Sequence, residues 1–216
     1  MNLEKARFNM VEQQVRPWSV LDDTVLRTME AIPRDNFVPD SQKLLAYADI
    51  ELPIGNGESM MYPRVEGRLL QELELDIEDE CLEVGTGSGF VTACMATMAK
   101  HINSIDIYDD FLKNADEKLA KVNISNVTLE NKDVFTAFSS HKKYDAIAVT
   151  GSIPEYLPFF EELLKPKGRL FIIVGSKQTM HAMKITRNNS TFERTSLFET
   201  EQKPLVGINK KSAFSF

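Results

Sequence analysis

Residues 81–90 read Cys-Leu-Glu-Val-Gly-Thr-Gly-Ser-Gly-Phe, a short apolar run followed by alternating glycines and the start of a second apolar segment. The run at 81–84 predicts a buried strand, and the segment at 90–99 predicts a helix. The glycines allow a sharp turn and close approach of a ligand, and the start of the helix leaves N–H groups free. Since ligands of open α/β sheets bind where strands end, we predict a cofactor-binding turn at Gly85, Gly87 and Gly89.

The residue types in this turn separate two classes of cofactor. A dinucleotide site requires glycine at the first, third and sixth positions of its motif, and the sixth position here is Phe90. The motif begins instead with an acid, Glu83, which attracts a sulfonium or ammonium group and would repel a pyrophosphate. The pattern therefore predicts S-adenosylmethionine as the cofactor. The alternative is that the glycines form only a tight strand-to-helix turn.

Two further acids lie at the ends of the following predicted strands. Asp106 ends the strand predicted at 102–107, where a carboxylate can accept hydrogen bonds from both ribose hydroxyls. Asp133 follows the strand predicted at 127–130, a position suited to the adenine amino group. Asp106 could instead start a helix, and Asp133 could cap the segment after it. The predicted cofactor site comprises Glu83, Gly85, Thr86, Gly87, Gly89, Asp106, Ile107, Asp133, Val134 and Thr150.

Apolar strands and amphipathic helices alternate from residue 80 onward, which predicts a mostly parallel, doubly wound α/β sheet. Two segments near the end, 180–187 and 192–198, predict an antiparallel hairpin at the sheet edge. The other predicted strands are 144–150 and 169–174, the other predicted helices are 109–122 and 155–164, and a turn is predicted at 166–168.

The first 75 residues differ in texture and read as helices and loops. Helices are predicted at 3–15, from an N-cap at Asp22 to residue 31, and at 63–75, and a Gly-rich turn is predicted at 52–57. We therefore predict one domain, 1–216. Residues 1–75 form an N-terminal helical extension with a substrate-side loop, and residues 76–216 form a Rossmann-like cofactor-binding core.

Composition narrows the range of partners. The formal net charge of −7 comes without a basic face, which argues against nucleic-acid binding. No apolar run reaches the ~18 residues of a membrane span, and the polar N-terminus lacks a signal core, so we expect a cytoplasmic protein. Cys81 and Cys94 are expected to be buried thiols, and the histidines match no metal-ligand spacing, so no metal is predicted. The oligomeric state is left open.

Six stretches together resemble the protein-L-isoaspartate O-methyltransferase family. They are MVEQQVRPWSVLDDTVLRTMEAIPRDNFVP (10–39), AYADIELPIGNGESMMYP (46–63), LEVGTGSGFVTA (82–93), YDAIAVTGSIPEYLP (144–158), LLKPKGRLFIIVG (163–175) and PLVG (204–207). The resemblance implies a class I S-adenosylmethionine-dependent methyltransferase fold. It also implies methylation of L-isoaspartyl and D-aspartyl residues in damaged proteins or peptides, for repair.

The acceptor side departs from the family pattern. The family carries an active-site serine where this chain has Met61, and Ser59 occupies the place of a threonine two residues earlier. Ser59 and Met61 are therefore the candidate catalytic-site residues. A thioether cannot donate a hydrogen bond, so Met61 could instead be a packing residue. Two alternative functions follow: methylation of another acceptor, or cofactor binding without isoaspartyl activity. The run at 150–153 lacks the pattern of enzymes that methylate nucleobase amines.

Overall fold

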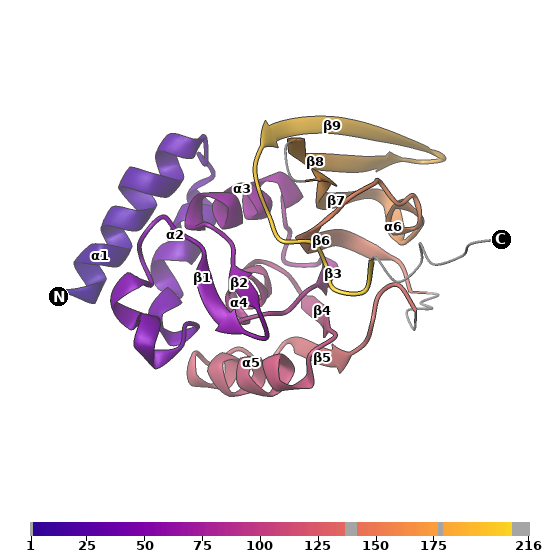
Figure 1. The fold of residues 1–216 in the computed structure, drawn as a ribbon. Helices are drawn as coiled ribbons and strands as arrows, with labels where there is room; N and C mark the ends of the chain where they lie inside the picture. The colour runs from indigo at the N-terminus through magenta and orange to yellow at the C-terminus, as the bar shows by residue number, and fades with distance from the viewer. Residues whose placement is uncertain (1, 137–141, 177–178, 209–216) are drawn as a thin grey trace.

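A seven-stranded sheet forms the centre of the computed structural model, which describes residues 2–136, 142–176 and 179–208 (Figure 1). Its strand order is β5-β4-β3-β6-β7-β8-β9. The strands from β5 to β7 are parallel, and β8 and β9 run antiparallel to their neighbours, which confirms the predicted fold class. The strands are β3 (Glu80–Val84), β4 (His101–Asp106), β5 (Val127–Asn131), β6 (Tyr144–Ile153), β7 (Leu164–Ser176), β8 (Thr179–Asn188) and β9 (Thr191–Glu199).

The chain changes direction across the sheet between β3 and β6. After β3 it moves outward through β4 to β5, and it then returns to β6 on the other side of β3. Such a reversal is where open α/β sheets bind their ligands. The glycine turn directly follows β3, so the fold places it at this point.

Side chains of β3 alternate between two apolar cores. Cys81 joins the larger core, beneath α4 (Phe90–Met98), and Leu82 and Val84 join the core on the opposite face. The larger core also contains residues of α2 (Asp23–Ala31) and α3 (Pro63–Leu73), and the smaller one contains Phe160 of α6 (Phe159–Glu162). Because successive strand residues face opposite ways, Glu83 points under α4, on the same face as Cys81.

The N-terminal region is helical, as predicted, but its first helix is not uniform. α1 (Leu3–Met10) passes into a π-helical turn (Val11–Val15) and a 3₁₀ turn (Arg16–Trp18) instead of running to residue 15 as one α-helix. The predicted cap at Asp22 is confirmed, because its carboxylate accepts hydrogen bonds from the backbone N–H groups of Thr24 and Val25 at 2.7 and 3.2 Å.

A β-hairpin occupies the region where only a turn was predicted. β1 (Leu52–Gly55) pairs with β2 (Glu58–Met60) through a two-residue turn. Both turn residues, Asn56 and Gly57, have positive φ, at 51° and 80°. An Asn-Gly pair is the favoured sequence for this hairpin turn, which therefore has a local cause.

The turn predicted at 166–168 lies inside β7. β7 begins at Leu164, and its pairing with β6 shifts register between Leu164 and Arg169. Lys167 has a φ of 67°, so the turn-forming residues produce an irregularity within the strand. The helix predicted at 155–164 is shorter than expected. Only Phe159–Glu162 is α-helical, and β7 already begins at Leu164.

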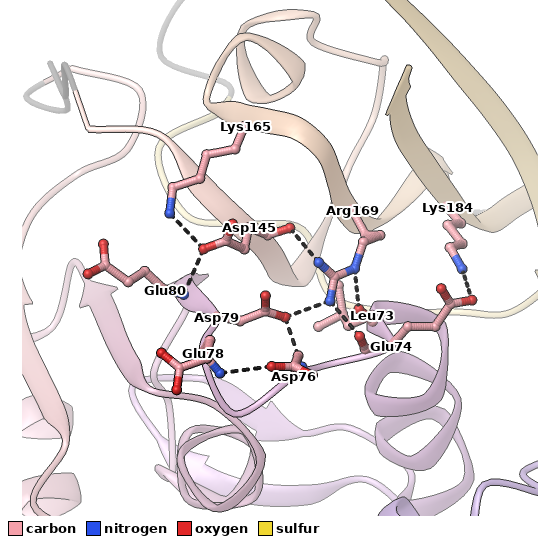
Figure 2. Close-up of polar contacts among 10 residues, drawn as sticks. All are labelled: Leu73, Glu74, Asp76, Glu78, Asp79, Glu80, Asp145, Lys165, Arg169 and Lys184. Atoms are coloured by element: carbon pink, nitrogen blue, oxygen red, sulfur yellow. Dashed lines mark hydrogen bonds and ion pairs between the residues drawn. The ribbon is translucent and has the colours of Figure 1, made fainter. Parts of the chain in front are cut away.

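An arginine fastens the end of the sheet opposite the glycine turn (Figure 2). Arg169 donates hydrogen bonds to the backbone carbonyls of Leu73, Glu74 and Asp145 at 2.7, 2.5 and 3.1 Å, and to the carboxylate of Asp79 at 2.6 Å. The guanidinium thus ties the end of α3 to the beginnings of β3 and β6.

Within the described residues, no helix is long and apolar enough to cross a membrane.

Candidate active site

The glycine turn after β3 packs tightly against its neighbours. At Gly85, φ is 99°, and a Cβ atom would lie 2.3 Å from the Thr150 Oγ1 atom. That hydroxyl donates a 2.7 Å hydrogen bond to the Gly85 carbonyl, which holds the turn against β6. At Gly89, a Cβ atom would lie 2.9 Å from Cβ of Ala115 in α5 (Asp109–Lys121). Gly85 thus serves the turn, whereas Gly89 lets two helices approach.

A pocket with an empty volume of about 660 Å³ opens beside this turn. Seven of the predicted cofactor residues line it, namely Gly85, Gly87, Asp106, Ile107, Asp133, Val134 and Thr150. Glu83, Thr86 and Gly89 do not.

Asp106 is held in place by the backbone on both sides. Its Oδ2 atom accepts a 2.8 Å hydrogen bond from the N–H of Gly87, and its Oδ1 atom accepts one of 2.9 Å from the N–H of Tyr108. Burial raises the pKa of the Asp106 carboxyl above its usual range, and these backbone hydrogen bonds oppose the rise. Each carboxylate oxygen can accept a second hydrogen bond, so Asp106 is oriented and still able to bind a pair of hydroxyls.

Asp133 caps a turn and also lines the first pocket, so its capping position does not exclude the predicted adenine role. Its Oδ1 atom accepts a 2.9 Å hydrogen bond from the N–H of Phe135, so it caps the turn that follows β5. It also lines the pocket at the same time. Its Oδ2 atom accepts no hydrogen bond among the described residues and lies close to Gly207 of the last described segment.

A second pocket of about 350 Å³ adjoins the first, behind the glycine turn. Glu83 and Thr86 line it, so the acid that begins the motif faces this smaller pocket. The Glu83 Oε2 atom accepts hydrogen bonds from the hydroxyls of Thr92 and Ser104 at 2.5 and 2.6 Å. Its Oε1 atom is buried and has no partner among the described residues. Burial raises the pKa of the Glu83 carboxyl to about 7.

The two acceptor-side candidates lie beside this second pocket. Ser59 lines both pockets, and its buried hydroxyl has no hydrogen-bond partner among the residues described. Met61 is buried at 4% exposure and lines the second pocket, so its thioether also fits the packing interpretation. The structure thus brings Ser59, Met61 and Glu83 together around one cavity.

The β1–β2 hairpin is attached to both sides of the first pocket. Asn56 donates hydrogen bonds to the carboxylate of Asp110 in α5, at 3.0 and 3.1 Å. On the other side, the ammonium group of Lys203 donates to the Gly57 carbonyl. Glu58, Lys203 and Leu205 also line the pocket, although their sequence positions did not predict a site role. The quoted stretches at 46–63 and 204–207 contain or adjoin them and were the only signal.

The donor set suits S-adenosylmethionine. Carboxylates stand ready for hydroxyl and amino groups in the first pocket, and an unpartnered carboxylate oxygen and hydroxyl face the second. In the described part of the chain, no group of three or more His, Cys, Asp or Glu residues could hold a metal ion. Cys81 and Cys94 are buried free thiols, as predicted.

Comparison with known proteins points to one family. The family model for protein-L-isoaspartate(D-aspartate) O-methyltransferase matches residues 5–210. Protein-L-isoaspartate O-methyltransferases of Aliivibrio fischeri and Methanoculleus marisnigri are each 33% identical over 204 residues, covering 93% and 94% of this chain and 96% and 92% of theirs. The same fold occurs in a Plasmodium falciparum structure described as a protein-L-isoaspartate O-methyltransferase in complex with S-adenosyl-L-homocysteine. That structure has a TM-score of 0.80 and 20% identity, with 95% of this chain and 98% of that one covered. The chain therefore belongs to the protein-L-isoaspartate(D-aspartate) O-methyltransferase family.

Proposed function

We propose that this protein transfers a methyl group from S-adenosylmethionine to the side-chain carboxylate of L-isoaspartyl and D-aspartyl residues in proteins. The observation that carries the proposal is the junction of the two pockets, which share Ile54, Ser59, Gly85, Gly87 and Thr150. Asp106 and Asp133 line the first pocket but not the second, and they suit the adenosine half of the cofactor. Ser59 lies at this junction, and we propose that the acceptor enters there.

The chemistry asks little of the protein beyond positioning. The bound cofactor supplies an activated methyl group on its sulfonium. An acceptor carboxylate has an ordinary pKa of about 4, so at neutral pH it is already a nucleophile and needs no general base. Holding reactants in line can supply roughly 7–11 kcal/mol of the barrier. The Ser59 hydroxyl can donate to the acceptor carboxylate or its backbone, and the hairpin that carries Ser59 is tethered at its turn.

A methyl-transfer assay tests the proposal directly. Radiolabelled S-adenosylmethionine is incubated with an isoaspartyl peptide and with the normal aspartyl peptide of the same sequence. We expect base-labile label on the first peptide only. Equal label on both peptides, or none on either, would show that isoaspartyl residues are not the acceptor.

Met61 supports a second candidate, a family member that methylates a different carboxylate. It lines the second pocket where the family pattern has serine. If this candidate holds, the native protein has little isoaspartyl activity and Met61→Ser gains it, with unchanged affinity for S-adenosylhomocysteine. Under the main proposal, Met61→Ser alters activity only modestly, because Ser59 already supplies the hydroxyl. The peptide assay on both proteins separates the two candidates.

The wider setting extends the proposal. Damaged, isoaspartyl-containing proteins are the proposed partners, and their repair is the proposed purpose. The cytoplasmic location, the lack of nucleic-acid partners and the single-domain organisation stay predictions. Cell fractionation, nucleic-acid binding assays and limited proteolysis, respectively, would test them.

A further inference from the structure

The motif Arg34-Asp35-Asn36-Phe37-Val38-Pro39 is part of the family resemblance, yet the proposed chemistry makes no use of it. Arg34 is 0% exposed. Its guanidinium donates to both carboxylate oxygens of Glu66, at 3.0 and 3.2 Å. It also donates to the backbone carbonyls of Ala46, at 2.7 Å, and Met61, at 2.8 Å. One buried side chain therefore joins three segments of the N-terminal region. One of them is the acceptor segment, residues 59–61.

The same motif contacts the cofactor side. Phe90 is the first residue of α4, directly after Gly89, and the Arg34 guanidinium carbon lies 5.5 Å from the centroid of its ring. The Phe37 ring is fully buried and meets Phe90 edge to face, with 5.7 Å between centroids. The Phe37 carbonyl accepts a 3.0 Å hydrogen bond from Lys118 of α5. The motif is thus packed between the acceptor segment and the helix that begins at the glycine turn.

We propose that Arg34 is a positioning residue for methyl transfer, fixing the segment from Ser59 to Met61 relative to the glycine turn. This inference rests on the proposed function, because it concerns the same reaction. Glu66 orients the guanidinium, and its own carboxylate borders the second pocket. The hydrogen bond to the Met61 carbonyl then fixes the backbone two residues beyond Ser59.

Lysine could not replace arginine in this role. A guanidinium presents its donors in a fixed planar fork, whereas an ammonium is a single point on a flexible stem. Arg34→Lys keeps a positive charge beside Glu66, but one ammonium cannot hold the Glu66, Ala46 and Met61 oxygens in the present geometry. Displacements of about 1 Å remote from the reacting atoms can lower turnover on the order of 10²-fold. Arg34→Lys should therefore lower acceptor turnover by about that factor while sparing cofactor binding.

Arg169 offers a matched control. It too donates to backbone carbonyls from separate segments and to one carboxylate, but at the opposite end of the sheet (Figure 2). Arg169→Lys should lower the thermal midpoint and leave kcat/KM for the isoaspartyl peptide near native. Arg34→Lys should lower kcat/KM on the order of 10²-fold, with the Kd of S-adenosylhomocysteine unchanged. If both variants lose activity only in proportion to stability, Arg34 has a structural role alone and the proposal is wrong.

Two additions keep the test decisive. If Arg34→Lys does not fold, the double variant Arg34→Met/Glu66→Met removes the pair without leaving a buried charge and should show the same selective loss. Amide hydrogen exchange at 59–62 provides a readout that needs no acceptor. Exchange there should rise in the Arg34 variants and not in Arg169→Lys, and unchanged exchange would overturn the proposal. A native protein inactive on the peptide, with that rise present, would refute the proposed function but not the positioning.

Discussion

Replacing Glu83 with glutamine should stabilise the protein relative to the native chain, and this gain in stability should increase as the pH rises. The carboxyl is fully buried, and its pKa rises from an ordinary 4.5 to about 7 on folding. The folded state therefore binds a proton that the unfolded chain releases between these two pH values. As the pH rises through this window, the Glu83 carboxyl loses its proton inside the fold, and the cost of a buried negative charge lowers the stability of the folded state. The amide of Glu83→Gln cannot ionise and avoids that loss.

The magnitude follows from the two pKa values. Between pH 5 and pH 8, this one group lowers the free energy of unfolding of the native protein by roughly 2–3 kcal/mol. The hydroxyls of Thr92 and Ser104 can hydrogen-bond an amide as well as a protonated carboxyl. The difference in stability between Glu83→Gln and the native protein should therefore shift by roughly 2–3 kcal/mol toward the variant over that range.

Urea denaturation at pH 5, 6, 7 and 8, without cofactor, measures this difference. Glu117→Gln is the control, because it removes one negative charge from an exposed position on α5. A stability difference that stays constant with pH, or that changes equally in the control, would refute the reasoning. It would mean that Glu83 is already ionised in the fold well below pH 7.

Two other substitutions test the cofactor turn. Gly85→Ala should destabilise the protein by at least about 2 kcal/mol, because φ is 99° and the new methyl group would lie 2.3 Å from the Thr150 Oγ1 atom. Adding Thr150→Ala should recover part of that loss in urea denaturation, and no recovery would contradict the contact. Asp106→Asn should weaken binding of S-adenosylhomocysteine about 10- to 100-fold in calorimetry, since hydrogen bonds to charged groups contribute about 1.5–3 kcal/mol. An unchanged Kd would exclude Asp106 from the ribose site.

The core of the fold could be predicted because its signals are local. Continuous apolar runs marked β6 and β7, and glycines marked the turn after β3. The remaining features of the fold depend on strand pairing, which the sequence does not state. The Pro166-to-Gly168 sequence signals a turn, but β7 continues through it because its pairing with β6 absorbs the extra residues as a register shift. The β1–β2 hairpin was missed because its strands are very short and one contains Pro53.

The site divides in the same way. Asp106 and Asp133 could be located because Asp106 ends a strand of recognisable pattern and Asp133 lies two residues after the end of another. The direction in which Glu83 points could not be read as easily, since it depends on which face of β3 α4 covers. Arg34 gave no chemical signal at all in the sequence. Its importance comes from carbonyls of residues 46 and 61 that meet it only in the folded chain.

The strand order also has a kinetic consequence. β7, β8 and β9 are joined by short connections, so their pairings close small loops and can form early. The central pairing of β3 with β6 joins residues more than sixty positions apart, such as Cys81 and Ala146, and closes a much larger loop. We therefore expect the glycine turn, which lies at this junction, to be completed late in folding. A bound cofactor should therefore act chiefly by slowing unfolding, and pulse proteolysis would register it as a longer lifetime of the native chain rather than faster refolding.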